Sequence, residues 1–183
     1  MALAQTNICA FGWKAGEFSL KGVDGRTYSF ADVRGPKGTL VAFICNHCPY
    51  VRAIIGRLVS EANALRDIGI GTIAVMPNDT QAYREDSFDN MRAFAAKNNF
   101  GFPYVIDETQ EVAKAYGAQC TPDFFGFNAR DELQYRGRLD ASRTTLVANA
   151  RRDLFEAMKQ VAETGRGPQE QTPSMGCSIK WKD

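Results

Sequence analysis

The chain has 183 residues, of which 44% are hydrophobic and 23% are charged, and its formal net charge is +1. This length suits one domain that buries a sizeable core without disulfides or metals. The near-neutral charge gives no reason to expect nucleic acid or an anionic membrane surface as a partner. No stretch approaches the ~20 apolar residues of a membrane span. No signal-peptide pattern precedes Lys14, so we expect an unprocessed N-terminus.

The cysteines are few and odd in number, which does not fit a disulfide scaffold. They are Cys9, Cys45, Cys48, Cys120 and Cys177. Together with the missing secretion signal, this usage favours a reducing, cytoplasmic location. A reactive pair there is catalytic rather than structural.

The first part of the chain is predicted to form short strands and turns. Residues 16–30 have the pattern of a hairpin, 31–34 of a helical turn, and 35–38 of a chain break. Residues 39–44 are continuously apolar, which is typical of a strand covered on both faces. A buried strand is therefore expected to end at Cys45.

A long helix is predicted from Pro49 until Gly69, because apolar residues recur every three or four positions. They form one stripe: Val51, Ile54, Ile55, Leu58, Val59, Ala62 and Leu65. Residues 70–76 are the next apolar strand. Ser87 is expected to cap another helix, with Phe88, Met91 and Phe94 on one face.

The second half continues the alternation of strands and helices. Residues 102–106 are predicted as a strand, 109–116 as a helix, and 124–127 with 133–137 as a hairpin. A last helix is expected over 144–163. Its inward residues would be Leu146, Ala150, Leu154, Ala157, Met158 and Val161. This order predicts an α/β domain with a central sheet and right-handed crossovers.

The strongest chemical signal is the pair Cys45 and Cys48 at the junction between a buried strand and a helix. A helix N-terminus presents unpaired N–H groups and partial positive charge, which favour thiolate over thiol. Cys45 is therefore expected to have a depressed pKa and to act as a nucleophile. Cys48 lies three residues on and can close a small disulfide ring with Cys45.

His47 is the single histidine of the chain and lies inside this motif. A nearby imidazolium would further stabilise a thiolate. A stabilised reduced form makes the disulfide more oxidising, so we expect a potential above that of an ordinary cytoplasmic reductant.

Two plainer interpretations are a pair of core cysteines and half of a zinc site. Core cysteines rarely take this spacing at a strand-to-helix junction. Zinc would need two more ligands, and the candidates His47, Cys120 and Cys177 lack motif spacing. We expect neither a metal nor another cofactor.

Several segments together resemble the thioredoxin-like superfamily, in particular its peroxiredoxin-like (AhpC/TSA, redoxin) branch. The matching segments are 15–20, 23–30, 41–49, 116–122 and, in one uncharacterised subfamily with the same C-N-H-C-P-Y motif, 176–181. The resemblance implies a thioredoxin fold, with a central mixed sheet flanked by helices, an N-terminal β-hairpin extension and an inserted helix. It implies a domain over 11–163, followed by a C-terminal tail over 164–183.

The resemblance assigns two different roles to the thiols. In the thioredoxin pattern Cys45 attacks and Cys48 resolves; in the peroxiredoxin pattern Cys48 is peroxidatic. The latter pattern has a threonine where this chain has Cys45, and its site is completed by an arginine, for which Arg136 and Arg138 are candidates. The buried acid that assists thioredoxins has no counterpart in residues 40–44.

The resemblance also places a cis-proline loop at Thr121-Pro122, where the backbone would pair with substrate. Tyr50 is expected to be a substrate contact at the surface, above a floor of Phe43 and Ile44. Two further cysteines are possible auxiliary thiols, Cys120 beside the loop and Cys177 in the tail. The tail is expected to dock through Ile179 and Trp181, and extended it could reach the motif.

Three functions are therefore weighed. The leading one is a thiol–disulfide oxidoreductase that exchanges disulfides with a protein or low-molecular-weight thiol client and is recharged by a dithiol reductant. The second is a thiol peroxidase in which Cys48 becomes a sulfenic acid and Cys45 resolves it. The third is a copper-handling binding module, which would need a histidine distant from the motif.

Overall fold

The computed structural model describes residues 2–183, which form a seven-stranded mixed sheet and a smaller three-stranded sheet. The large sheet has the order β3-β2-β6-β5-β4-β8-β9, and the small one has the order β1-β10-β7. The strands are β1 Leu3–Gln5, β2 Ser19–Gly22, β3 Thr27–Ser29, β4 Gly38–Phe43, β5 Ile70–Met76, β6 Tyr104–Ile106, β7 Cys120–Thr121, β8 Asp123–Asn128, β9 Leu133–Tyr135 and β10 Met175–Ser178. The helices are α1 Phe30–Val33, α2 Pro49–Asp67, η1 Arg84–Asp86, α3 Phe88–Lys97, α4 Glu111–Tyr116 and α5 Asp153–Thr164.

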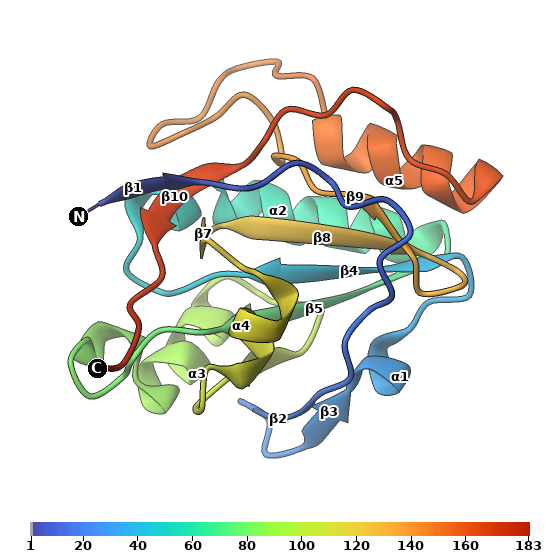
Figure 1. The fold of residues 1–183 in the computed structure, drawn as a ribbon. Helices are drawn as coiled ribbons and strands as arrows, with labels where there is room; N and C mark the ends of the chain where they lie inside the picture. The colour runs from blue at the N-terminus through green and yellow to red at the C-terminus, as the bar shows by residue number, and fades with distance from the viewer. Residues whose placement is uncertain (1) are drawn as a thin grey trace.

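The strand β4 lies at the centre of the large sheet (Figure 1). It pairs in parallel with β5 and antiparallel with β8, so that Phe43 is in register with both Val75 and Asp123. All six residues of β4 are buried, as expected for a strand covered on both faces. Successive residues face opposite sides: Leu40 belongs to the core beneath α2, and Val41 to the core beneath α1 and α4.

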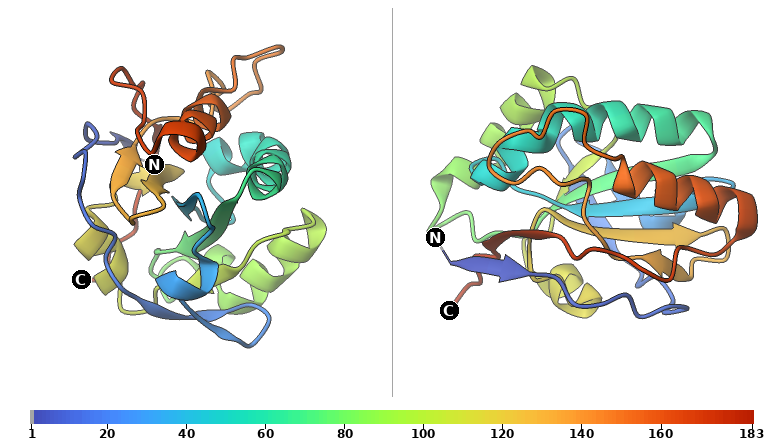
Figure 2. Two further views of the ribbon diagram at one scale, coloured as in Figure 1. Left: turned by 90° about the vertical axis from the view of Figure 1, so that its right-hand side faces the viewer. Right: turned by 90° about the horizontal axis from the view of Figure 1, so that it is seen from above.

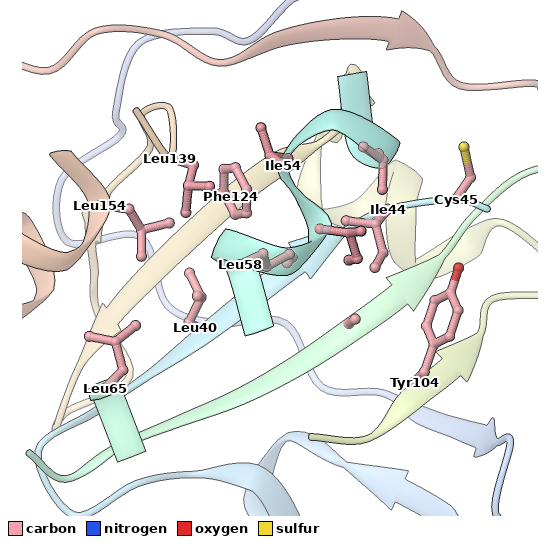
Figure 3. Packing of buried hydrophobic residues seen from close by; sticks show 14 of the residues in the cluster. Leu40, Ile44, Cys45, Ile54, Leu58, Leu65, Tyr104, Phe124, Leu139 and Leu154 are labelled. Atoms are coloured by element: carbon pink, nitrogen blue, oxygen red, sulfur yellow. The ribbon is translucent and has the colours of Figure 1, made fainter. Parts of the chain in front are cut away.

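Helices cover both faces of the large sheet, with α2 and α5 on one face and α1 and α4 on the other (Figures 1 and 2). Figure 3 shows the first of these layers, where Leu58 and Ile54 of α2 lie over Leu40 and Ile44. The apolar side chains of α2 and β4 thus pack together in one layer between the helix and the sheet. This arrangement confirms the expected thioredoxin-type fold with a central mixed sheet.

The helix α2 forms where the apolar stripe predicted it. All seven stripe residues are buried, and Pro49 occupies the first helical turn, where its missing N–H costs nothing. Cys48 is the N-cap, and the helix ends just before Gly69, whose φ is +91°. Local sequence alone therefore determines both ends of the helix that carries the motif.

The last helix is shorter than predicted. It begins at Asp153 rather than at residue 144, and Leu146, expected to face inward, is 53% exposed. The preceding loop is held instead by Arg57, which donates to the Asp140 carboxylate at 2.7 Å and to the Val147 carbonyl at 2.7 Å. Hydrogen bonds from a distant helix thus override the local helical pattern.

The tail is ordered against the domain through β10, which lies between β1 and β7. Ile179 is buried as expected, whereas Trp181 is 41% exposed and lies with its ring centroid 5.6 Å from Lys114 Nζ of α4, at the surface of the domain. The strand β1 has no counterpart among the predicted elements. Whether residue 163 is a domain boundary stays a prediction.

Among the residues that the structure describes, none of the helices has both the length and the apolar character that crossing a bilayer requires.

Candidate active site

The two motif cysteines lie where the central strand passes into α2. Cys45 follows β4 and Ile44, and Figure 3 shows its sulfur at the end of that strand. Cys48 caps α2 through the backbone. Both side chains are buried, with 1% and 0% exposure. Ile44 is fully buried in the same cluster as both thiols, as expected for the floor of the site. Phe43 is also fully buried but belongs to the cluster on the opposite face of the sheet.

The loop before β8 approaches both thiols. The Thr121–Pro122 peptide bond is cis, as the resemblance implied. Cys45 Sγ lies 3.4 Å from Thr121 Oγ1, and Cys48 Sγ lies 3.2 Å from the Thr121 carbonyl oxygen. The structure therefore brings Cys45, Cys48, Thr121 and Pro122 together.

The tail brings a third thiol into this group. Cys177 of β10 is in register with Thr121 of β7, and its Sγ lies 2.8 Å from Cys48 Sγ. The sequence raised Cys177 as an auxiliary thiol in a tail long enough to reach the motif, where it could resolve a disulfide at Cys45 or Cys48. Cys48 is therefore the middle of three sulfurs, with Cys45 on one side and Cys177 on the other.

The lowered pKa falls on Cys48, not on Cys45. The pKa of Cys48 is lowered to about 5, chiefly by the hydrogen bond from Cys45, with further support from the Cys177 thiol and the Val51 backbone N–H, against the effect of burial. The pKa of Cys45 is raised well above its usual value by that same hydrogen bond, by burial and by the charge of Asp86. The raised pKa of Cys45 differs from the expected depressed one, because its interaction with Cys48, its burial and the charge of Asp86 all favour the thiol.

His47 points toward a buried carboxylate. Its Nδ1 lies 2.7 Å from Asp86 Oδ2, and its ring stacks on Tyr83. Asp86 also accepts from the Asn46 backbone N–H at 2.8 Å and from Asn78 Nδ2 at 2.9 Å. The expected imidazolium is thus paired with an acid rather than free to act on a thiolate alone.

Asp86 is the residue that sequence reasoning missed. It is fully buried in η1, and no motif marks it. One signal was present: the polar segment after β5 must lie at the same edge of the sheet as Cys45, because β4 and β5 are parallel. The absent acid of β4 is therefore replaced by one from the next crossover.

Cys45, His47 and Asp86 are the groups whose arrangement could hold a metal ion, since one ligand atom from each lies within 4.8 Å of the others. His47 Nδ1 lies 2.7 Å from Asp86 Oδ2, but it is buried and has no hydrogen-bond partner of suitable geometry among the described residues. The three groups belong to two neighbouring segments, the motif and η1.

Two further predicted residues, Tyr50 and Cys120, lie close to the cis-proline loop. Tyr50, half-buried, lines a cavity of about 130 Å³ together with Pro122, Arg138 and Ser174. Cys120 is buried, and its Sγ contacts the Pro122 carbonyl at 3.4 Å. Cys120 is thus near the loop without joining the group of three sulfurs.

Neither candidate arginine donates a hydrogen bond to a thiol. Arg136 is buried and pairs with Asp123 at 3.0 Å, and Arg138 pairs with Asp153 at 2.8 Å. Both guanidinium groups are thereby engaged with carboxylates. The arginine of the peroxiredoxin pattern is not supplied by either residue in this conformation.

Comparisons with known proteins agree with this geometry. An uncharacterized conserved protein from Geobacillus kaustophilus is 42% identical with a TM-score of 0.93, and the match covers 100% of this chain and 97% of that one. The thioredoxin domain of a thiol-disulfide oxidoreductase from Bacteroides vulgatus is 20% identical with a TM-score of 0.58, over 73% of this chain and 89% of that one. This second match shows the fold.

A curated relative is the thiol-disulfide oxidoreductase ResA of Halalkalibacterium halodurans, which is 23% identical over 130 residues, or 71% of this chain and 69% of the relative. The family model of the AhpC/TSA family matches residues 11–154. These matches support an oxidoreductase enzyme. The chain belongs to the AhpC/TSA family.

Proposed function

We propose that this protein is a thiol–disulfide oxidoreductase in which Cys45 and Cys48 exchange disulfides with a protein or small thiol client. The observation that carries the proposal is the approach of both sulfurs to one residue, Thr121, within 3.4 Å. The backbone beside such a loop can pair with an extended client strand. The named relatives that act on disulfides support the same class of reaction.

The chemistry follows from the different acidities of the two thiols. The pKa of Cys48 is lowered, whereas that of Cys45 is raised. As Cys45 attacks a client disulfide, its proton passes to the Cys48 thiolate, and one client sulfur leaves as a thiolate. Cys48 then attacks the mixed disulfide, which releases the second client thiol and leaves a Cys45–Cys48 disulfide. A dithiol reductant restores the reduced pair.

His47 and Asp86 position the residues around Cys45. Asp86 holds the Asn46 backbone, and Tyr104 donates to the Asn46 side-chain oxygen at 2.8 Å. Figure 3 shows the Tyr104 hydroxyl directed toward the end of β4. His47, 18% exposed at its side chain, is the polar group that a client would meet first. Tyr50, Thr121 and Pro122 would line the client's path.

A peroxidase is the second candidate, and one observation favours it: the low pKa falls on Cys48, the sulfur that the peroxiredoxin pattern makes peroxidatic. Cys48 would then be oxidised to a sulfenic acid by a hydroperoxide, and Cys45 would condense with it and release water. The engaged guanidinium groups of Arg136 and Arg138 weigh against this reaction.

Two serine variants separate the candidates. With a disulfide-bearing peptide, Cys48→Ser should accumulate a mixed disulfide through Cys45, whereas Cys9→Ser, a thiol outside the site, should turn over like the wild type. If Cys45→Ser still consumes hydrogen peroxide and Cys48→Ser traps no peptide, the peroxidase reaction replaces the proposed one.

A further inference from the structure

The edge of the small sheet beside the thiols is already occupied by the chain itself. β10 pairs antiparallel with β7, with Cys177 opposite Thr121 and Ser178 opposite Cys120. Strand addition at such an edge is how extended peptides bind to sheets, with main-chain hydrogen bonds giving affinity. The segment at this position in the structure is therefore arranged as a bound client strand would be.

The residue of β10 that meets the site is a cysteine. Cys177 is opposite Thr121, and its sulfur is 2.8 Å from Cys48 Sγ. Cys177 therefore lies within reach of the resolving sulfur of the proposed pair. The tail thus brings a thiol as well as its backbone to the site.

The residue before Cys177 explains how the strand comes so close. A Cβ on Gly176 would lie 2.0 Å from the Thr121 carbonyl oxygen, which no side chain can tolerate. The approach therefore requires a residue without a side chain beside the thiols. A segment in which glycine precedes cysteine fits this edge.

Short contacts hold the tail, and they end at the His47–Asp86 pair. Ser174 Oγ donates to the Pro122 carbonyl at 2.7 Å, and β10 pairs with β7 over two positions. Beyond β10, the Lys180 backbone N–H donates at 3.0 Å to the side-chain oxygen of Asn78, whose amide binds Asp86. β10 also pairs with β1 over three positions, and Ile179 is buried, so the strand leaves only when these contacts break as well. The pairing of β4 with β5 and β8 does not involve the tail and can persist when it leaves.

We propose that β10 is a resident substrate strand that occupies the client edge, and that Cys177 is the internal exchange partner of Cys48. This proposal rests on the proposed function and deepens it. A client with a glycine before its cysteine binds only after β10 has left. The tail is thereby a competitor for the site that every client must displace.

The internal step needs no added oxidant once the pair is oxidised. Cys177 loses its proton and attacks Cys48 Sγ of the Cys45–Cys48 disulfide; a Cys48–Cys177 bond forms, and Cys45 leaves and takes up the proton. One disulfide is exchanged for another with no net change in electrons. The isomer frees Cys45 as a thiol and fixes the tail on the site.

The pairing is tested in the full chain carrying Cys45→Ser, treated with oxidised glutathione and mapped by peptide mass spectrometry. Cys48 displaces one glutathione thiolate and becomes glutathionylated, and Cys177 then displaces the second. We expect a Cys48–Cys177 disulfide here and also in Cys45→Ser/Cys9→Ser. Stable glutathionylated Cys48 is expected only in Cys45→Ser/Cys177→Ser. If the adduct persists equally in Cys45→Ser itself, the proposed pairing is wrong.

Occupancy of the client edge is tested with Gly176→Val, whose Cβ collides with Thr121, and with Ser178→Val as a control on the same strand. If β10 leaves Cys48 uncovered for about a tenth of the time or less in the reduced wild type, alkylation is slowed by the same factor. We therefore expect alkylation of Cys48 to be about tenfold faster or more in reduced Gly176→Val. Ser178→Val should react like the wild type. Equal Cys48 rates in the two variants, with equal thermal unfolding temperatures, would show that β10 does not cover the site.

Wild-type exchange with a disulfide-bearing peptide is measured in parallel, so that the two proposals can fail separately. Exchange without any Cys48–Cys177 bond overturns the resident strand and leaves the oxidoreductase. A Cys48–Cys177 bond without exchange overturns the proposed client reaction and the client role of this edge.

Discussion

The large and the small sheet hold the two sides of the thiol group in different ways. β4, which leads to Cys45, pairs along its whole length with β5 and β8 and is covered on both faces. β10, which carries Cys177, pairs with β7 over two positions and with β1 over three. The first side is fixed by the core, and the second by a few hydrogen bonds. The Cys177 side of the three sulfurs can therefore open while the Cys45 side stays rigid.

The largest expected effect concerns the pKa of Cys48, whose sulfur lies between the two sheets. The pKa of Cys48 is lowered from 9.0 to about 5 by hydrogen bonds from thiols on both sides. The thiolate absorbance of the reduced protein should therefore rise as the pH passes through about 5, and Cys48→Ser should lack this step. Between about pH 5 and pH 9, Cys48 is protonated in the unfolded chain and ionised in the folded chain. The free energy of unfolding of the reduced protein should thus rise from about pH 5 to pH 9.

A titration step near the ordinary cysteine pKa in both proteins would contradict this assignment of the thiolate. Cys177→Ala sharpens the comparison between the sheets, because it removes only the hydrogen bond from the tail. The step should then move to a higher pH and remain below the ordinary value, since the Cys45 bond is the largest cause.

The second prediction tests how firmly the large sheet is fixed. Arg136→Ala leaves Asp123, fully buried in β8 beside Phe43, without its partner. Loss of one member of a buried ion pair costs about 3–5 kcal/mol. Denaturant unfolding should show this loss, whereas Arg130→Ala, an exposed pair with Glu132, should cost about 1 kcal/mol or less. Equal unfolding midpoints for the two variants would contradict the account.

The third prediction tests the small sheet alone. Ser174→Ala removes the shorter of two hydrogen bonds to the Pro122 carbonyl, the other coming from Cys120, at a cost of about 1 kcal/mol. This loss should appear mainly as faster alkylation of Cys177. The control is Ser87→Ala, which removes the N-cap of α3 at a cost of about 1 kcal/mol. If both variants expose Cys177 equally, the tail opens only with the whole domain.

The smallest effect concerns the charge beside Cys45. Asp86 raises the pKa of Cys45, so its neutralisation should lower that pKa. The comparison is made in Cys48→Ser, where Cys45 titrates without its partner, with and without Asp86→Asn. Glu85→Gln, exposed in the same turn, is the control and should leave the titration unchanged. An unchanged titration in Asp86→Asn would show that the charge of Asp86 does not affect the pKa of Cys45.

The sequence predicted what depends on local pattern. Neighbouring residues determine the apolar stripe of α2, the apolar run of β4 and the junction at Cys45. These patterns, together with the family resemblance, predicted the fold. The start of α5 did not follow, because Arg57 holds the preceding loop from another helix.

The rest of the site depends on contacts between distant residues. Cys48 and Cys177 are 129 positions apart, and only the register of β10 on β7 brings them together. Such a register is set by Gly176 and by the edge it meets, which no local pattern records. Asp86 was missed for a similar reason, since its role depends on the parallel pairing of β4 with β5.

The central claim is that Cys48 belongs to a reversible redox pair with Cys45. The most direct measurement is a redox titration of the wild type and of Cys177→Ser, with alkylation and peptide mass spectrometry to locate each disulfide. The account predicts a reversible Cys45–Cys48 disulfide with a defined potential in Cys177→Ser, and a reversible disulfide that includes Cys48 in the wild type. A Cys48 that stays a thiol in both proteins, or that passes irreversibly to higher oxidation states, would contradict it.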